Sequence, residues 1–356
     1  MSTEHPDWGR RLSDALRAAI GRNDLAAALA LARDGDGQAR SLASEFLLMS
    51  RGLGITVRVL LGQLGGLTGG LTPSSGTVPD SQALERDLRR LLADFRGSLE
   101  GPQEGRDSVL GDGLLGGQAS DRGGESLPEV AEFTLRTLQA RQQRFESEQA
   151  VAAQQVIDAL LAHDAVQASH WLDRKEIHDY LPYHDRLVRF MADSFGFVLD
   201  RFGDQGLLHF HLDTAEGQRA GFEKWEKQSA AEFARTSAFL LKQHMGQVAV
   251  TEDDEKFTIV QTPCGSGGRL QIAGAYRGAR PLPFVSTPGP LTLGAPRMPV
   301  YCSHCPAWNG VATMRWFGRA HWIFDHPARP DGSCTLHVYK RPEDVPAEFN
   351  ARLAPA

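Results

Sequence analysis

A chain of 356 residues with 41% hydrophobic content is long enough to bury the cores of two or more globular domains. Its net charge of −6 and its pI near 6.1 argue against general nucleic-acid binding, because phosphate binding needs a basic surface. The polar, acidic N-terminus predicts no secretion signal, and the most apolar run, 46–71, is broken by charges and glycines. The sequence therefore predicts a cytoplasmic protein with no membrane span and no nucleic-acid partner.

The first two thirds of the chain show the 3.6-residue hydrophobic period of helices. Asn23 is the expected N-cap of the second helix, and proline at 182 should end the helix before it. Residues 65–80 and 101–126 are rich in glycine and predict a loop and a linker. The stretch 139–149 is very polar, which indicates contact with solvent or with a second subunit and leaves a homodimer open. The expected helices cover 7–20, 23–34, 41–61, 81–99, 128–162, 165–181, 184–201, 215–225 and 230–245.

After residue 246 the hydrophobic period changes from 3.6 to 2, which predicts strands over 247–251, 256–262, 321–325 and 334–340. The first two form a hairpin around an acidic turn, and the proline-rich stretch 281–299 is expected to cover a site. We therefore predict an α+β fold, mainly helical in its first two thirds, with a small antiparallel sheet in the last third. The expected division is a helical region 1–99, a linker 100–127, a helical domain 128–246 and a cysteine-rich domain 247–356.

All four cysteines of the chain lie in the last quarter, at positions 264, 302, 305 and 334. Cys302 and Cys305 have CxxC spacing, which supplies two metal ligands from one tight turn. Cys264 follows one expected strand, and Cys334 opens another. The pattern predicts a metal site of Cys264, Cys302, Cys305 and Cys334, with zinc the expected ion and an iron–sulfur cluster the alternative. Four thiolates would close a structural site, and three would leave a position open for catalysis.

Two other interpretations of the cysteines stay open. Cys264 precedes three glycines within four residues, so it is also a candidate metal-free nucleophile with an oxyanion hole of backbone N–H groups. The same segment lacks the ending of a phosphate-binding loop, which makes that interpretation weak. Cys264 and Cys334 are otherwise small buried residues without a chemical role.

Three further groups of residues are candidates for the site. His209, His211 and Asp213 would share one face of an extended segment, as metal ligands do. The pairs His178-Asp179 and His184-Asp185 place a histidine beside a carboxylate, which is typical of a general base or of solvated helix ends. The last group is rich in tryptophan and arginine and predicts either a pocket with a carboxylate-binding arginine or a core strand. Its members are Trp308, Arg315, Trp316, Phe317, Arg319, His321 and Trp322.

The last quarter of the chain also resembles the L-2-amino-thiazoline-4-carboxylate hydrolase-like family. The residues that carry the resemblance are 257–264, Cys302 and 332–339, at most about a quarter of the chain. Cys305 and the large helical part have no counterpart that we can match. The resemblance implies hydrolytic opening of a small C–N or C–S heterocycle, or of an amide-like bond, with Cys264, Cys302 and Cys334 as site residues.

The sequence therefore predicts a metal-dependent hydrolase or lyase that acts on a small carboxylated molecule containing nitrogen or sulfur. Arg315 or Arg319 would hold the carboxylate, and His304 or His184 would move protons. The alternative from another class is a redox-sensing or ligand-sensing protein with an iron–sulfur cluster or structural zinc. An exchangeable ligand position beside Trp316 would favour the enzyme.

Overall fold

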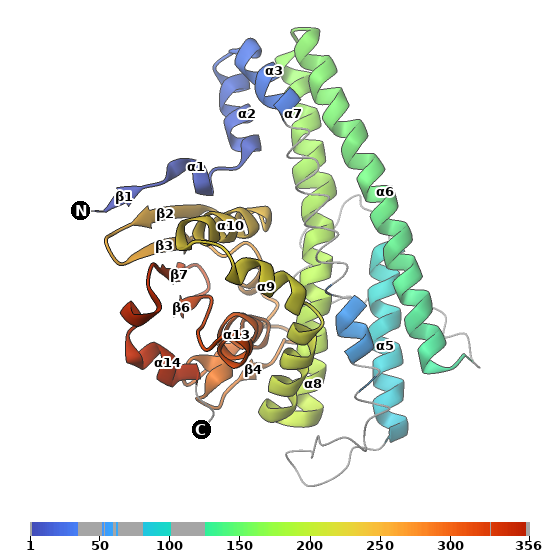
Figure 1. The fold of residues 1–356 in the computed structure, drawn as a ribbon. Helices are drawn as coiled ribbons and strands as arrows, with labels where there is room; N and C mark the ends of the chain where they lie inside the picture. Colours follow the sequence, from blue (N-terminus) through green and yellow to red (C-terminus); the bar gives the residue numbers. More distant parts are fainter. Residues whose placement is uncertain are drawn as a thin grey trace.

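The computed structural model describes residues 2–34, 52, 54–59, 62, 81–100, 125–327 and 329–353. It confirms the α+β fold, with helices in the first two thirds and a small antiparallel sheet near the C-terminus (Figure 1). No helix within the described ranges combines the length and the apolarity needed to cross a membrane. The expected loop 65–80 and nearly all of the expected linker lie outside the described residues, as does most of the expected helix 41–61, of which 54–59 are helical.

The N-terminal segment is one edge strand followed by short helices, where we expected two helices. An extended pair at Arg10 and Arg11 separates the first two helices. The third helix is capped by Asp24, whose carboxylate accepts the N–H of Ala27 at 3.1 Å, whereas Asn23 adopts a left-handed φ of 56° after the preceding helix. The elements are β1 (Thr3–Glu4), α1 (Pro6–Gly9), α2 (Leu12–Gly21) and α3 (Leu25–Asp34).

Three long helices form the body of the molecule. In Figure 1, α8 stands between the sheet-bearing part on one side and α5 and α6 on the other. Their shared core is built from residues at helical spacing, such as Leu84, Leu88 and Leu92 of α5, all essentially buried. The elements are α5 (Ser81–Glu100), α6 (Leu127–Leu161), α7 (Ala165–Asp173), the π-helical segment η1 (Arg174–Tyr180) and α8 (Leu181–Glu216).

The polar middle of α6 buries one face within the same chain. Arg141, Phe145 and Gln149 are at most 3% exposed, and the Gln149 amide donates to the Lys175 carbonyl of η1 at 2.8 Å. The guanidinium of Arg141 lies 3.7 Å from the ring centre of Tyr183. This buried face packs against its own chain, and a homodimer stays a prediction.

Two sequence expectations about helix ends are wrong. The helix does not stop before Pro182, because the π-helical turns of η1 lead directly into α8, with Pro182 in the first turn of α8. The helix from 184 breaks at Gly203, with φ 66° and ψ −169°, but it resumes and runs to Glu216. Residues 209–213 are therefore helical rather than extended.

The sheet has five antiparallel strands in the order β1-β2-β3-β7-β6. Strands β2, β3, β6 and β7 lie within two residues of their expected limits, whereas the edge strand β1 was not expected. Helix α10 covers one face, where Phe233, Ala238 and Leu241 pack on Ile259 and Leu336. The elements of this part are α9 (Arg219–Glu226), α10 (Ala230–Gln243), β2 (Val248–Glu252), β3 (Lys256–Gln261), α11 (Gly267–Ile272), β6 (Ile323–Asp325), β7 (Cys334–Tyr339) and α14 (Ala347–Leu353).

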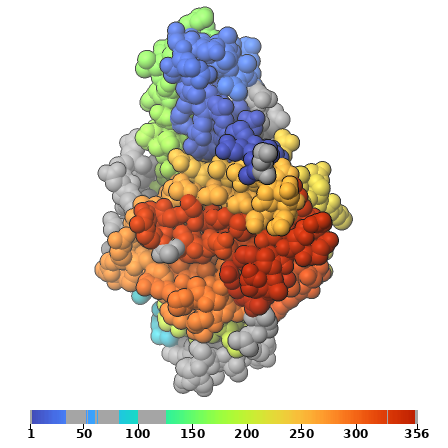
Figure 2. All heavy atoms as spheres, turned by 90° about the vertical axis from the view of Figure 1, so that its left-hand side faces the viewer, coloured from blue at the N-terminus to red at the C-terminus, as the bar shows by residue number. Residues whose placement is uncertain are grey.

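A long excursion from the sheet lies between α11 and β6. Its residues Leu282, Val285 and Val300 pack into the core around α8, so one continuous core contains side chains from both sides of the expected boundary at 246. Figure 2 shows this C-terminal part as one face of the molecule, with the N-terminal helices rising above it. The elements are β4 (Phe284–Val285), η2 (Pro290–Thr292), β5 (Met298–Pro299), η3 (Val300–Ser303), α12 (His304–Pro306), the π-helical η4 (Ala307–Ala312), α13 (Thr313–Phe317) and, after the sheet, η5 (Pro342–Asp344).

Candidate functional site

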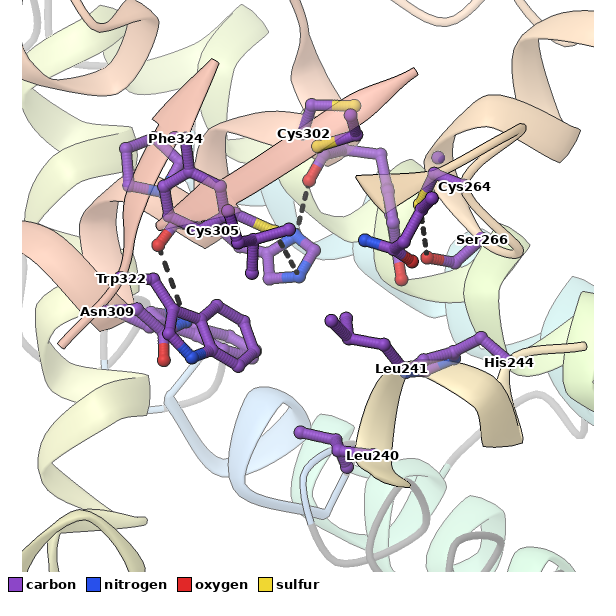
Figure 3. Close-up of a pocket in the computed structure, with 18 of the residues that line it drawn as sticks. Leu240, Leu241, His244, Cys264, Ser266, Cys302, Cys305, Asn309, Trp322 and Phe324 are labelled. Carbon is purple, nitrogen blue, oxygen red and sulfur yellow. Dashed lines mark hydrogen bonds between the residues drawn. The ribbon is translucent and has the colours of Figure 1, made fainter. Parts of the chain in front are cut away.

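The four cysteines come from four places in the fold and line one cavity of about 510 Å³. Cys264 follows β3, Cys302 lies in η3, Cys305 in α12, and Cys334 is the first residue of β7. All four are free thiols. In Figure 3, the labelled Cys264, Cys302 and Cys305 lie along one side of the pocket, across from Leu240, Leu241 and His244 of the α10 end. The sequence grouping of the cysteines therefore corresponds to one place in space.

The strand register and two glycines bring these thiols together. Gln261 at the end of β3 pairs with Cys334 at the start of β7, so Cys264 begins its loop next to Cys334. A Cβ on Gly267 would lie 2.7 Å from the Cys302 sulfur, and a Cβ on Gly268 would lie 3.3 Å from the Cys264 Cβ. Glycine is thus required at 267 for η3 to approach α11 this closely.

Burial decides the charge state of the thiols. Desolvation raises the pKa of Cys302, Cys305 and Cys334, and repulsion from the neighbouring thiols raises each further. Cys264 is among the neighbours in all three cases, so the four sulfurs interact electrostatically. Without a cation, these three thiols are neutral at pH 7 and weak nucleophiles.

Whether the donors fit a metal ion is a question of both chemistry and placement. Thiolate and imidazole are ligands that Zn²⁺ prefers. Among the residues that the structure describes, however, no three His, Cys, Asp or Glu side chains are grouped closely enough to hold a metal ion. A common ligand set therefore requires rotation of the cysteine side chains toward one another. The donor set fits zinc by type, and metal binding stays a proposal.

His304 lies beside the CxxC pair in the cavity wall. Its Nδ1 donates to the Tyr301 carbonyl, and its Nε2 lies 3.5 Å from the Cys305 sulfur. Burial lowers the pKa of His304 to about 4, so the ring is neutral at pH 7. With Nδ1 protonated, Nε2 carries the lone pair that can accept a proton or bind a metal.

A second histidine reaches the cavity through a chain of hydrogen bonds. His184 Nδ1 lies 2.9 Å from the Asp185 carboxylate, and His184 Nε2 lies 2.8 Å from Nδ1 of His244, which lines the cavity. Arg269 pairs with Asp185 at 3.1 Å and donates to the His244 carbonyl at 2.7 Å. Burial lowers the pKa of both histidines, so the rings of His184 and His244 are neutral at pH 7.

The hydrogen-bond distances assign the tautomers of this chain. A carboxylate can only accept, so the 2.9 Å contact with Asp185 favours the tautomer in which His184 Nδ1 carries the proton; the competing donor, Arg269, lies farther away at 3.3 Å. His184 Nε2 then accepts from the Nδ1–H of His244. This assignment makes Nε2 the basic nitrogen of His244.

The structure does not bring either predicted arginine to the cysteines. Arg319 pairs with Glu226 at 3.0 Å, and Arg315 is exposed on α13. Neither is among the cavity residues, and Trp316 is also absent from them, whereas Trp308 and Trp322 line the cavity. The expected substrate-carboxylate clamp is therefore not formed in this arrangement.

The other predicted groups of residues are also not brought together at one site. In helix α8, His209 and Asp213 are exposed while His211 is buried and lies 2.9 Å from the Ser303 hydroxyl, so the three share no face. Of the other pairs, His178 is exposed on η1. His337, which the sequence places three residues after Cys334, pairs with Asp325 at 3.1 Å and is not a cavity residue.

Sequence reasoning missed His244, Gln261 and Asn309, which all line the cavity. His244 is the C-cap of α10, and Gln261 ends a strand, positions with no chemical signature. Asn309 lies in the π-helical η4, one turn after the CxxC pair, and such segments occur often at functional sites.

The chain matches no protein-family model, no curated protein and no solved structure. The resemblance to the thiazoline-carboxylate hydrolase-like family therefore stays an expectation.

Proposed function

We propose that Cys264, Cys302, Cys305 and Cys334 form a metal site in which three of the four thiolates would bind one ion, with zinc the expected metal. We propose further that the protein is a metal-dependent hydrolase or lyase for a small molecule containing nitrogen or sulfur. The observation that carries the proposal is the meeting of four thiols and three neutral histidines, His244, His304 and His326, in one cavity of about 510 Å³. A purely structural zinc site needs no such cavity.

With three thiolates holding the ion, a further ligand position would be left for substrate or water. Zinc, when bound, supplies Lewis acidity that polarises the reacting bond or activates water. His244 takes up the proton through its Nε2, while Asp185 holds the His184 tautomer that makes this nitrogen basic. His304 is placed to receive the Cys305 proton when that thiol ionises. The thiols must stay reduced to bind a metal, which supports a cytoplasmic location as part of the proposal.

The metal-free nucleophile has less support. The described contacts of the Cys264 sulfur include the Ser266 hydroxyl at 3.5 Å, but within the described residues no imidazole forms a hydrogen bond with it. A cysteine nucleophile needs a nearby base or cation to become a thiolate. The histidine nearest to a thiol pairs with Cys305 instead.

The open ligand position is tested by replacing the metal with Co²⁺ and recording the visible spectrum. We expect thiolate-to-cobalt charge-transfer bands and cobalt d–d bands. The d–d bands should change when cyanide is added, because an open ligand position exchanges ligands. A spectrum that cyanide does not change would indicate a closed site of four thiolates and favour the sensing or structural alternative. Bound iron with sulfide would also contradict the hydrolase.

The proton chain is tested by ¹⁵N NMR of the histidine rings. We expect His244 to be protonated at Nδ1 in the wild type. Asp185→Ala should shift the proton to Nε2, because Arg269 then donates to His184 Nδ1 and reverses the chain. Asp179→Ala, which removes a buried carboxylate of η1 paired with Arg174, is the control and should leave the His244 tautomer unchanged. A His244 already protonated at Nε2 in the wild type would refute the assignment.

A further inference from the structure

Three residues that line the cavity each carry one buried side-chain polar atom with no hydrogen-bond partner among the residues that the structure describes. These atoms are Gln261 Oε1, Asn309 Oδ1 and Trp308 Nε1. Gln261 and Asn309 are only 3% and 5% exposed. Buried polar groups in folded proteins are nearly always hydrogen-bonded, so these atoms indicate a partner that enters the cavity.

These atoms lie close to the cysteines in the fold. Gln261 is the strand partner of Cys334. Asn309 donates its Nδ2 to the Cys305 carbonyl at 3.4 Å, which leaves its Oδ1 as the acceptor without a partner. These three lining residues therefore offer two acceptors and one donor, the Trp308 indole N–H, that a molecule in the cavity could satisfy after small side-chain rotations.

The rest of the cavity is apolar and largely aromatic. Its lining includes Trp225, Trp322, Phe222 and Phe324, together with leucines and methionines. Among the described lining residues the only charged side chain apart from histidine is Lys224, which is exposed on α9. A carboxylate placed near the cysteines would face the side-chain carbonyl oxygens of Gln261 and Asn309 and, among the described lining residues, no buried cationic side chain. A zinc ion held by three thiolates would leave the site with a net negative charge, which also disfavours a carboxylate.

We infer that the cavity binds an uncharged aromatic molecule whose N–H or O–H groups donate to Gln261 and Asn309 and whose acceptor receives the Trp308 indole N–H. The inference deepens the proposed function, because this molecule would be its substrate. It replaces the carboxylated substrate that the sequence predicts. An amide group beside the cysteines would supply the N–H donor that Gln261 and Asn309 require. An amide is also a bond that a hydrolase can cleave.

The test compares two probes of nearly equal size, naphthalene-2-carboxamide and naphthalene-2-carboxylate, by isothermal titration calorimetry on the full chain. We expect the carboxamide to bind at least about tenfold more tightly, because only it donates hydrogen bonds and avoids burial of a charge. Gln261→Leu should weaken carboxamide binding about three- to tenfold. The control is Gln228→Leu, which removes another unpaired buried Oε1, in the separate cavity beside His321, and should leave the affinity unchanged.

Equal or tighter binding of the carboxylate would overturn the inference, and so would failure of both probes to bind at millimolar concentration. Unchanged carboxamide affinity in Gln261→Leu would overturn it as well. Because a substitution in a strand can disturb folding, Asn309→Leu provides a second variant with the same expected loss. The titrations are repeated after EDTA treatment, which removes any bound metal. If the protein proves to contain no metal, the proposed function fails, but binding of the uncharged aromatic molecule is still tested.

Discussion

Gly267→Ala tests the close approach that brings Cys302 into the site. The added Cβ would lie 2.7 Å from the Cys302 sulfur and 3.2 Å from Cδ1 of Tyr301. Cβ atoms in proteins essentially never lie as close to another heavy atom as the first of these distances. Tyr301 is buried in the main core and can shift little. We therefore expect the cysteine side chain to move away from its neighbours.

The magnitude follows from a matched comparison with Gly221→Ala. Gly221 lies in α9 with no atom within 4 Å of its added Cβ, so this substitution should stabilise by about 0.5–1 kcal/mol through helix propensity alone. Gly267 is also helical, in α11, but overpacking costs about 1–3 kcal/mol. Gly267→Ala should thus be less stable than Gly221→Ala by about 1–3 kcal/mol.

Two assays measure the consequences. Urea unfolding in EDTA reports the free energy of unfolding without metal, and competition with a chromophoric chelator reports zinc affinity. If displacement of the Cys302 sulfur weakens the free energy of zinc binding by about 1.4 kcal/mol, zinc affinity should fall about tenfold in Gly267→Ala. It should remain unchanged in Gly221→Ala. Equal stability and equal zinc affinity of the two variants would refute the role assigned to Gly267.

Two further pairs of variants compare buried with exposed interactions by urea unfolding. Trp322→Phe should cost about 1–3 kcal/mol, because it removes a buried indole hydrogen bond of 2.9 Å to a serine of α10, whereas Trp316→Phe loses an exposed one and should cost less than about 1 kcal/mol. Arg17→Ala should cost about 3 kcal/mol, because Arg17 pairs at 2.8 Å with the fully buried Glu176 side chain, whereas Arg136→Ala breaks an exposed pair and should cost at most about 1 kcal/mol. Equal losses within either pair would contradict the burial argument.

Periodicity predicted the elements whose packing is regular. Helix α5 follows its leucine stripe from Leu84 to Phe95, and β7 begins at Cys334 as expected. The expected hairpin and the antiparallel sheet also agree with the structure. In these segments, local pattern and tertiary burial favour the same conformation.

Segments near the site were harder to predict because tertiary packing overrides local signals. Pro182 ends a helix by rule, yet the π-helical turns before it allow the helix to continue. The His209–Asp213 segment has strand-like spacing but follows a glycine break within α8 and buries only one of its two histidines. Neither outcome is visible in a local pattern.

The clustering of cysteines predicted a site in the last quarter of the chain, and the cavity contains all four. His304 was also placed there. The residues that complete the cavity come from far apart in the sequence, as His184 and His244 do, and their contact depends on how α8 packs near the end of α10. Arg319 was misplaced because its partner, Glu226, lies on α9, which no spacing rule indicates.

Elemental analysis with a visible spectrum, on protein purified without oxygen, tests the central claim most directly. We expect about one zinc ion per chain and no colour, with loss of the zinc when both Cys302 and Cys305 are replaced by serine, because only two thiolates then remain. Iron with sulfide and a brown absorbance would contradict the hydrolase and favour redox chemistry. Protein that contains no metal and takes up none from zinc-containing buffer would contradict the claim that these four cysteines are metal ligands.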